Sequence, residues 1–295
     1  MSNWSHYRLV NTITEALHAL ASASGSARPI AGGTDLLLEI QQGRHPPVNT
    51  LVDLTRIPEL RCLEIRQSAL FIGSAVPVRQ VTENALVQQH AQALLEACSL
   101  IGGPQVRNTA TLGGNVAHAL PAADGTIALV ALDARVEIAN RDGRRLVPIL
   151  DLFRGVGQST LSVNQEILVG FHLPLHKVRQ ASAFGRVMNP QGVALPVLNM
   201  AVWLERAADR IQSIRIAIGP SGPVPQRASA LEQSLAGAVF GVEALEKAKI
   251  LVDSSMRFRT SPQRASAAYR YHLCKVLLGD IADVAWRRTF AVEEA

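Results

Sequence analysis

Two glycine pairs set among polar residues are the features of this sequence best suited to holding a ligand. Residues 29–36 read Pro-Ile-Ala-Gly-Gly-Thr-Asp-Leu, and residues 111–115 read Thr-Leu-Gly-Gly-Asn. Glycine lets the backbone take positive φ and come close to a ligand without an intervening Cβ. A strand, a glycine turn and a helix start together form a general anion cradle, because exposed N–H groups and the helix dipole both favour negative charge.

A single Gly-Gly turn is most often only a tight connection, but two copies with matching polar flanks favour a shared ligand site. Neither copy fits GxGxxG or GxxxxGK[ST], which disfavours both the usual dinucleotide-binding fold and the Walker loop. We therefore expect the two turns, far apart in the sequence, to face each other across a slot that holds one ligand.

Composition excludes several other classes of protein. The 295 residues are 48% hydrophobic and 18% charged, which indicates a globular chain, and no apolar run is long enough to span a bilayer. Despite a net charge of +5, thinly spread arginines and 4% aromatic residues argue against nucleic-acid binding. Cys62, Cys98 and Cys274 lack metal-ligand spacing, so we expect buried thiols in a reducing compartment and no iron-sulfur cluster or zinc in this chain. No export signal is evident at the N-terminus, and we expect a cytoplasmic protein.

Short elements must carry the first glycine pair. Residues 13–20 repeat apolar side chains at helical spacing, and residues 28–31 indicate a short buried strand that runs into the glycines. A helix is expected over 34–42, ending at Gly43, with the next strand at 51–54. The first pair then lies at the carboxyl end of a strand, where open α/β sheets bind ligands.

The second glycine pair lies among elements of mixed type. Residues 106–112 look extended before the glycines, and Asp124 is placed to cap an apolar helix over 125–132. Asp142-Gly143 between two strand-like runs indicates a hairpin. The other elements expected here are strand-like residues 60–73, a helix over 88–100, hairpin strands at 135–139 and 145–149, and a strand over 166–173.

The last third of the chain is expected to form a small α+β domain. Polar residues 176–180 mark its beginning. Two strands follow at 194–205 and 211–218, then a helix over 242–251 and one or two helices across 266–284. Strands followed by helices are typical of a domain with a sheet covered on one face.

Taken together, these stretches resemble the FAD-binding medium subunits of the molybdenum hydroxylases, the family of xanthine dehydrogenase and carbon monoxide dehydrogenase. The likeness spans nearly the whole chain, including its α+β C-terminal third. It rests on PIAGGTDLL at 29–37, QVRNTATLGGNVAHALPAAD at 105–124 and EILVGFHLP at 166–174. The central stretch is the most specific of the three.

The resemblance implies an FAD held between two lobes of the p-cresol methylhydroxylase and vanillyl-alcohol oxidase fold, followed by an α+β domain with an antiparallel sheet plus helices. The implied divisions are lobe 1 at 1–55, lobe 2 at 56–176 and the C-terminal domain at 177–295. By motif position, the implied cofactor-binding residues in lobe 1 are Ile30, Ala31, Gly32, Gly33, Thr34, Asp35 and Leu36, which would hold the pyrophosphate and neighbouring parts. Those implied in lobe 2 are Thr111, Gly114, Asn115, Asp124 and Leu168.

Two positions depart from the family pattern. Ile101 stands where some members place an aromatic residue on the flavin ring. Arg186, in the run Ala183 to Asn189, stands where many members carry a lysine, and we expect it to supply the positive charge. The guanidinium of arginine is planar and stays protonated, so replacing lysine by arginine is not conservative. We expect this exchange to affect the redox potential of the flavin or the choice of electron acceptor.

Other polar residues near the motifs have ordinary structural explanations. We expect His118 to be a structural histidine rather than a proton donor, and Arg107 and Asn108 to shape the loop before Thr111. Asp35 suits a cofactor hydroxyl and the first turn of a helix equally well. Flavin chemistry belongs to the cofactor, so no catalytic side chain is expected in this chain.

The resemblance also implies partners. Electrons would leave a substrate at a large molybdopterin-binding subunit, cross two [2Fe-2S] clusters in a small subunit, and reach the FAD of this chain, in a dimer of heterotrimers. The final acceptor, whether NAD, oxygen or a quinone, and the substrate stay open. Two alternatives also stay open: a stand-alone flavin reductase of the same fold, like the one acting on UDP-N-acetylenolpyruvylglucosamine, and a scaffold subunit that has lost FAD.

Overall fold

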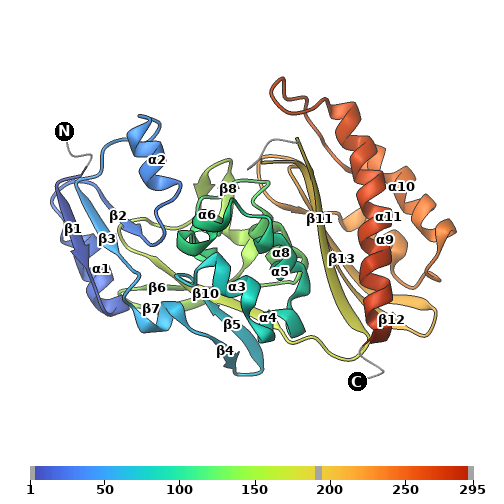
Figure 1. Cartoon of the computed structure of the whole chain (residues 1–295), viewed down its shortest axis with the longest axis horizontal. Helices are drawn as coiled ribbons and strands as arrows, with labels where there is room; N and C mark the ends of the chain where they lie inside the picture. Colours follow the sequence, from blue (N-terminus) through green and yellow to red (C-terminus); the bar gives the residue numbers. More distant parts are fainter. Residues whose placement is uncertain (1–3, 190–194, 292–295) are drawn as a thin grey trace.

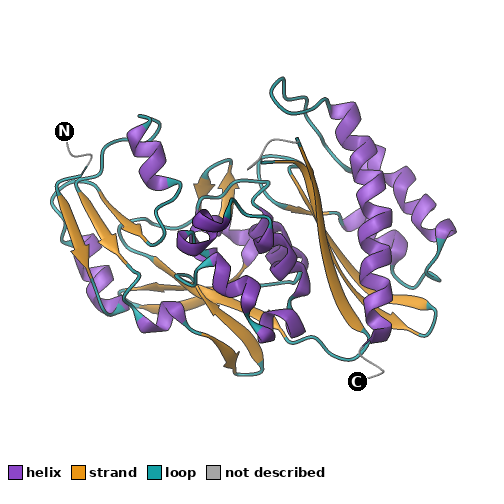
Figure 2. Ribbon diagram, in the orientation of Figure 1, coloured by secondary structure: helices purple, strands orange, loops and turns teal. Residues whose placement is uncertain are grey.

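The computed structural model describes residues 4–189 and 195–291. Three sheets of three or more strands follow one another along the molecule, with helices between the second and third and on the outer face of the third (Figures 1 and 2). The first two sheets and their helices come from the N-terminal part of the chain, and the third comes from the C-terminal part. No helix among the described residues is long and apolar enough to cross a membrane.

A small parallel sheet, in the order β1-β3-β2, carries the first glycine pair. Its elements are β1 (His6–Leu9), α1 (Ile13–Ala21), β2 (Ala27–Ile30), α2 (Leu36–Gln41) and β3 (Thr50–Asp53). Thr12 caps α1 by accepting a hydrogen bond from the Glu15 amide. The glycine pair follows β2 directly and leads into α2, as predicted.

A five-stranded antiparallel sheet, in the order β4-β5-β10-β6-β7, forms the centre of the molecule. The strands are β4 (Leu63–Arg66), β5 (Ala69–Gly73), β6 (Arg135–Asn140), β7 (Gly143–Pro148) and β10 (Ile167–Pro174). Alternate residues face opposite sides of a strand. Phe71 accordingly packs in the core beside α1, while Leu70 and Ile72 pack in the core with the helices. The predicted hairpin at Asp142-Gly143 is confirmed.

Helices and short elements cover the central sheet. They are η1 (Pro58–Arg61), α3 (Val78–Glu83), α4 (Ala85–His90), α5 (Gln92–Ser99), α6 (Pro104–Thr109), α7 (Leu112–Ala117), α8 (Asp124–Ala131), η2 (Ile149–Leu152), β8 (Phe153–Gly155) and β9 (Gln158–Ser159). The predicted helix over 88–100 is broken at Ala91, between α4 and α5.

The extended run predicted over 106–112 is wrong, because Val106 to Thr109 lie in α6 and Leu112 begins α7. Pro104 begins α6, a position where its missing N–H costs nothing. Thr111 caps α7 by accepting a hydrogen bond from the Gly114 amide at 3.1 Å. Both signals, Pro104 and Thr111, were present in the sequence, although β-branched residues such as Val106 and Thr109 favour strands.

The C-terminal sheet is antiparallel, in the order β11-β12-β13-β14. Its elements are β11 (Gln180–Met188), β12 (Pro196–Ala207), β13 (Arg210–Gly219), β14 (Gln226–Arg227), α9 (Ser229–Leu235), α10 (Val242–Ser255) and α11 (Ala267–Ala291). Residues 266–284, expected to hold one or two helices, lie almost entirely in α11. Sequence reasoning missed β1, β11 and α9, and the expected strand start at Ala194 lies outside the described residues.

Helices α5 and α8 join the central part to one face of the C-terminal sheet, and α11 covers the other. Phe184 and Trp203 belong to the core shared with the central helices, whereas Leu198 and Val202 belong to the core under α11. The Ser182 hydroxyl accepts a hydrogen bond from the Ala93 amide at 3.1 Å. The two parts therefore share one continuous apolar layer.

A histidine pair lies where the chain passes from the central to the C-terminal part. His90 Nδ1 and His176 Nε2 are buried without hydrogen-bond partners among the described residues. Burial, with the nearby charges of His90 and Arg215, lowers the pKa of His176 to about 4. The folded chain therefore keeps this imidazole neutral at pH values where an unfolded imidazole is protonated.

We predict that replacing Gly113 destabilises the fold more than replacing Gly114, its neighbour in α7. A Cβ on Gly113 would lie 2.5 Å from the Ser74 carbonyl oxygen, whereas one on Gly114 would meet only the Thr111 hydroxyl, at 3.2 Å. Gly113→Ala should lower the free energy of unfolding by about 1–3 kcal/mol through overpacking, and Gly114→Ala should change it by less than about 1 kcal/mol. Urea unfolding measures both, and equal losses would contradict the packing role of Gly113.

The His176 environment predicts acid sensitivity. As pH falls from 6.5 toward 4, the His176 imidazole becomes protonated in the unfolded chain but stays neutral in the folded chain. Protonation therefore stabilises the unfolded state and lowers the free energy of unfolding. Its contribution over that window is roughly 3 kcal/mol. His176→Gln should flatten the dependence of unfolding free energy on pH in this range, and the exposed control His6→Gln should leave it unchanged.

Candidate functional site

The two glycine turns meet in the structure. A Cβ on Gly32 would lie 2.2 Å from the Thr109 carbonyl oxygen and 2.9 Å from the Ala110 Cα, so the first turn rests on the backbone just before Thr111. Gly33 has a φ of +67°, a conformation that L side chains rarely adopt. The juxtaposition expected from the sequence, with Gly32 and the Thr111 to Asn115 stretch on the same side of the molecule, is therefore confirmed.

His118, at the end of α7, connects the second turn to the helix that follows the first. Its Nδ1 lies 3.6 Å from Asp35 Oδ2, and its Nε2 lies 3.4 Å from Glu39 Oε1. These contacts cross between the segments that carry the two glycine pairs. They support the structural role expected for His118, and they give the Asp35 carboxylate a partner within the protein.

Backbone amides of the first turn are free to bind a ligand. Among the described residues, the N–H groups of Gly32, Gly33, Thr34 and Asp35 donate no hydrogen bond within the chain. They follow a strand and precede α2, an arrangement that suits an anionic group. Ile30 is buried, whereas Ala31 and Leu36 are only partly covered.

The second turn contributes a bare surface and a free amide oxygen. The Gly114 amide is already bonded to Thr111, so Gly114 offers an exposed Cα rather than an N–H donor. Asn115 Oδ1 is buried without a partner among the described residues and faces the Cα of Gly125, where a Cβ would lie 2.8 Å from it. Together the two turns present free amides, an unpaired amide side chain and glycine surfaces. These features fit the diphosphate and hydroxyl groups of a dinucleotide cofactor.

Asp124 belongs to a buried polar cluster between the central part and the C-terminal sheet. Its Oδ2 accepts a hydrogen bond from Arg186 at 2.5 Å, and its Oδ1 accepts one from Asn199 at 2.6 Å. Burial raises the pKa of the Asp124 carboxyl, while Arg186 and Asn199 partly offset that effect. Arg186 Nε and Asn199 Oδ1 are buried and unpaired among the described residues.

The capping role expected for Asp124 is wrong. Ala123 occupies the N-cap position, and Asp124 is the first residue of α8, with its side chain turned to β11 and β12. The competing interaction was invisible in the sequence, because Arg186 and Asn199 lie more than sixty residues away. The structure thus brings Arg186 and Asp124 together and places both away from bulk solvent.

Ile101 and Leu168 lie against the central core. Ile101 is half-buried in the turn before α6, and Arg107 donates to the carbonyl oxygens of Ile101 and Gly102. Leu168 is 7% exposed, in β10 at a bulge opposite β6. Arg107 therefore shapes the turn before α6, and not the stretch before Thr111 as expected, because residues 104–109 form a helix.

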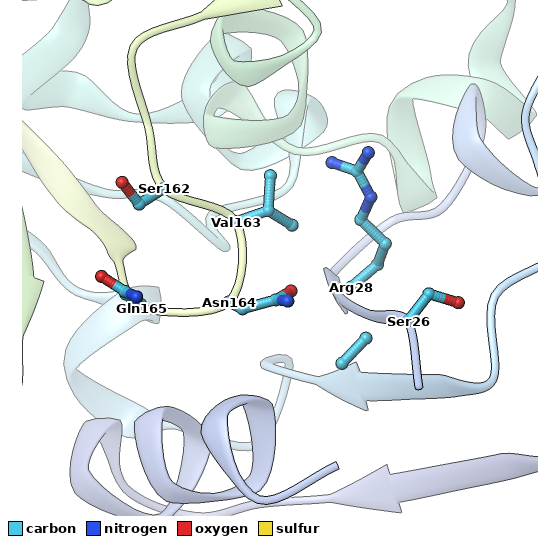
Figure 3. A pocket seen from close by; sticks show the side chains of 7 residues that line it. Ser26, Arg28, Ser162, Val163, Asn164 and Gln165 are labelled. Carbon is cyan, nitrogen blue, oxygen red and sulfur yellow. The ribbon is translucent and has the colours of Figure 1, made fainter. Parts of the chain in front are cut away.

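A hollow of about 380 Å³ opens between β2 and the loop before β10, a site that sequence reasoning missed (Figure 3). Its lining residues are Ser26, Ala27, Arg28, Ser162, Val163, Asn164 and Gln165. Burial lowers the pKa of the Arg28 guanidinium, which has no protein partner among the described residues. The available signal was a basic residue two positions before Ile30 in the same strand.

The fold and this site define a flavoprotein with an N-terminal FAD-binding part and a C-terminal α+β domain. Residues 3–176 match the FAD binding domain in molybdopterin dehydrogenase, and residues 183–283 match the CO dehydrogenase flavoprotein C-terminal domain. The chain belongs to the family of FAD-binding medium subunits of the molybdenum hydroxylases, which includes the xanthine and carbon monoxide dehydrogenases. It is an oxidoreductase subunit with FAD as cofactor, and the predicted fold class is confirmed.

Known relatives agree over nearly the whole chain. The xanthine dehydrogenase FAD-binding subunit of Escherichia coli O157:H7 is 31% identical, covering 94% of each chain. The nicotine 6-hydroxylase medium subunit of Paenarthrobacter nicotinovorans is 30% identical, covering 88% of this chain and 89% of the relative. A chain of carbon monoxide dehydrogenase from Hydrogenophaga pseudoflava superposes with a TM-score of 0.90 at 28% identity, covering 96% of this chain and 98% of the other.

We predict that Asp124→Asn strongly destabilises the chain, because it leaves the Arg186 guanidinium buried without a counter-charge. The free energy of unfolding should fall by about 3–5 kcal/mol, and adding Arg186→Met should restore part of it. Asp283→Asn, which breaks the exposed pair with Arg287, is the matched control and should cost less than about 1 kcal/mol. Denaturant unfolding measures all three, and a loss equal to the control would mean that the Asp124–Arg186 pair is solvated.

Proposed function

We propose that this chain carries electrons from the iron-sulfur clusters of a partner subunit, through its FAD, to an external acceptor. The observation that supports the proposal best is the meeting of the two glycine turns, of which the first carries four unpaired amides and the second an unpaired asparagine oxygen among the described residues. This chain has no group of side chains among its described residues that is arranged to hold a metal ion. The clusters of the proposed route therefore belong to another subunit.

The residues of the first turn have the task of holding the diphosphate of FAD. Free N–H groups of Gly32, Gly33, Thr34 and Asp35 can donate to phosphate oxygens without moving, because the turn is already held against Thr109 and Ala110. Gly33 supplies the positive φ that the turn requires. Ile30, Ala31 and Leu36 form the apolar flanks of the turn.

The second turn completes the site from the other side. Thr111 fixes the start of α7, Gly114 permits close approach, and Asn115 offers an unpaired oxygen to a hydroxyl or N–H group of the cofactor. Arg28, at the neighbouring hollow, adds an unpaired positive charge that suits an anionic or aromatic part of the cofactor. Ile101 and Leu168 provide apolar surface.

When bound, FAD accepts and donates electrons, and the protein orients it and sets its electrostatic surroundings. Arg186 holds a permanent positive charge against Asp124, in a position where a lysine could lose its proton. We propose that this fixed pair contributes to the redox potential of the flavin. The acceptor remains open between NAD, oxygen and a quinone.

The proposed assembly contains a large molybdopterin-binding subunit and a small subunit with two [2Fe-2S] clusters, as a dimer of heterotrimers. The relatives support this proposal, because several are named as an FAD-binding subunit, a medium chain or a medium subunit of a dehydrogenase or hydroxylase. The divisions at residues 55 and 176 and the cytoplasmic location stay predictions.

A reduced [2Fe-2S] subunit tests the proposed route directly. When it is mixed with the FAD-loaded chain, the visible absorbance of the flavin should decrease as the flavin is reduced.

Gly114→Val should lower FAD affinity at least tenfold while keeping the folded far-UV spectrum, because a branched side chain would cover the bare surface. Gly241→Val is the control, since a Cβ at Gly241 meets nothing within 4 Å. A chain that takes up no FAD would exclude the flavin site, and bound FAD that the clusters never reduce would exclude the electron route alone.

A further inference from the structure

A second basic feature lies far from the glycine turns, in the C-terminal domain. Residues 254–279 contain no aspartate or glutamate, yet they carry Arg257, Arg259, Arg264, Arg270 and Lys275. Such a run is normally a solvated basic face. One of its members, however, is not solvated.

Arg270 lies in the first turns of α11 and is only 2% exposed. Its Nε is buried without a hydrogen-bond partner, and its guanidinium makes no hydrogen bond or ion pair with the described residues. A buried charge is ordinarily paired or hydrogen-bonded, because desolvation without compensation costs several kcal/mol, on the order of the effective penalty for one buried ion. Arg270 therefore needs a partner that the described residues do not supply.

The loop near Arg270 carries further positive charge and no acidic residue that would neutralise Arg270. Residues 256–266 join α10 to α11 and project at the top of α11 (Figure 1). Met256 and Phe258 are buried and fix the loop to the core under α11, and a bridge between Ser261 and Ala265 closes it. Arg259 and Arg264 are exposed on this loop, and together with burial their charges lower the pKa of Arg270.

Neighbouring acids are already engaged. Asp253 of α10 pairs with Lys275 at 2.6 Å, and Glu246 pairs with Lys249 at 2.8 Å. Arg257 differs from the other arginines because it donates to the carbonyl oxygens of Ser254 and Met256. The uncompensated charges are thus those of Arg259, Arg264 and Arg270.

The helix terminus itself does not provide the binding groups. The Ala267 amide donates to the Thr260 hydroxyl at 3.0 Å, and the Tyr269 amide donates to the Ser266 hydroxyl at 3.2 Å. With these first-turn amides capped, any anion here would be bound by the guanidinium groups. Guanidinium is planar and presents paired N–H donors that match the oxygens of phosphate.

We propose that Arg270, with Arg259 and Arg264, forms a binding site for a phosphate-class oxyanion between the 256–266 loop and the start of α11. The anion supplies the counter-charge that the three arginines lack. The bound anion also connects the loop to α11, because Arg259 and Arg264 belong to the loop and Arg270 belongs to the helix. This site lies in the C-terminal domain, apart from the two glycine turns.

Titration of the FAD-loaded full chain with inorganic phosphate tests the proposal, because bound FAD blocks the anion-binding amides of the glycine turns. Isothermal calorimetry and phosphorus NMR line broadening should both show saturable binding. Arg270→Gln should weaken it at least tenfold, and Arg270→Lys should restore only part, because lysine keeps the charge but loses the planar fork. Arg141→Gln, an exposed arginine in the β6–β7 turn, is the matched control and should bind phosphate like the wild type.

A double variant protects the test against misfolding of the Arg270 variants. Arg259→Gln with Arg264→Gln alters only exposed side chains, so the fold should persist, and phosphate affinity should fall at least fivefold. Absence of saturable binding to the FAD-loaded wild type would overturn the proposal. So would an affinity in the double variant equal to that of Arg141→Gln.

Discussion

The contact between Gly32 and the backbone of Thr109 and Ala110 is the constraint on which the rest of the site depends. It allows no side chain at position 32, because a Cβ there would lie only 2.2 Å from the Thr109 carbonyl oxygen. Through this contact the turn after β2 is positioned relative to the cap of α7, and His118 adds polar contacts across the same seam. The ligand site is therefore a product of backbone packing, with few side chains of its own.

A second constraint joins that site to the rest of the chain. The Asp124 carboxylate is shared between Arg186 of β11 and Asn199 of β12, so a buried charge lies where the FAD-binding part meets the C-terminal sheet. Glu96 of α5 reinforces the same junction, since it accepts from the Phe184 amide and pairs with Arg288 of α11. The C-terminal sheet thus supplies the polar partners that surround the Asp124 carboxylate.

Local signals predicted much of this architecture from the sequence. Thr12, Gly43 and Asp142-Gly143 each act within a few residues, and the elements that they bound were found where expected. Tertiary contacts decided the remainder. The side chain of Asp124 binds residues that are distant in the sequence instead of capping the helix that it begins. β11 was missed because the polar residues Ser182 and Arg186, which bind the central part of the molecule, interrupt its apolar pattern. Arg28 escaped notice because its hollow forms only when the loop at 162–165 closes over β2.

The core beside α1 combines residues from both ends of the FAD-binding part. Leu17 of α1 and Val52 of β3 pack with Phe71, Ile167 and Val169 of the central sheet. During synthesis the amino-terminal segment therefore leaves the ribosome with an unfinished interior, which is completed only after Ile167 has emerged. Such long-range closure slows folding and exposes apolar surface to aggregation. The apolar side chains of Leu17 and Val52 therefore stay without their β10 partners for most of the synthesis of the FAD-binding part.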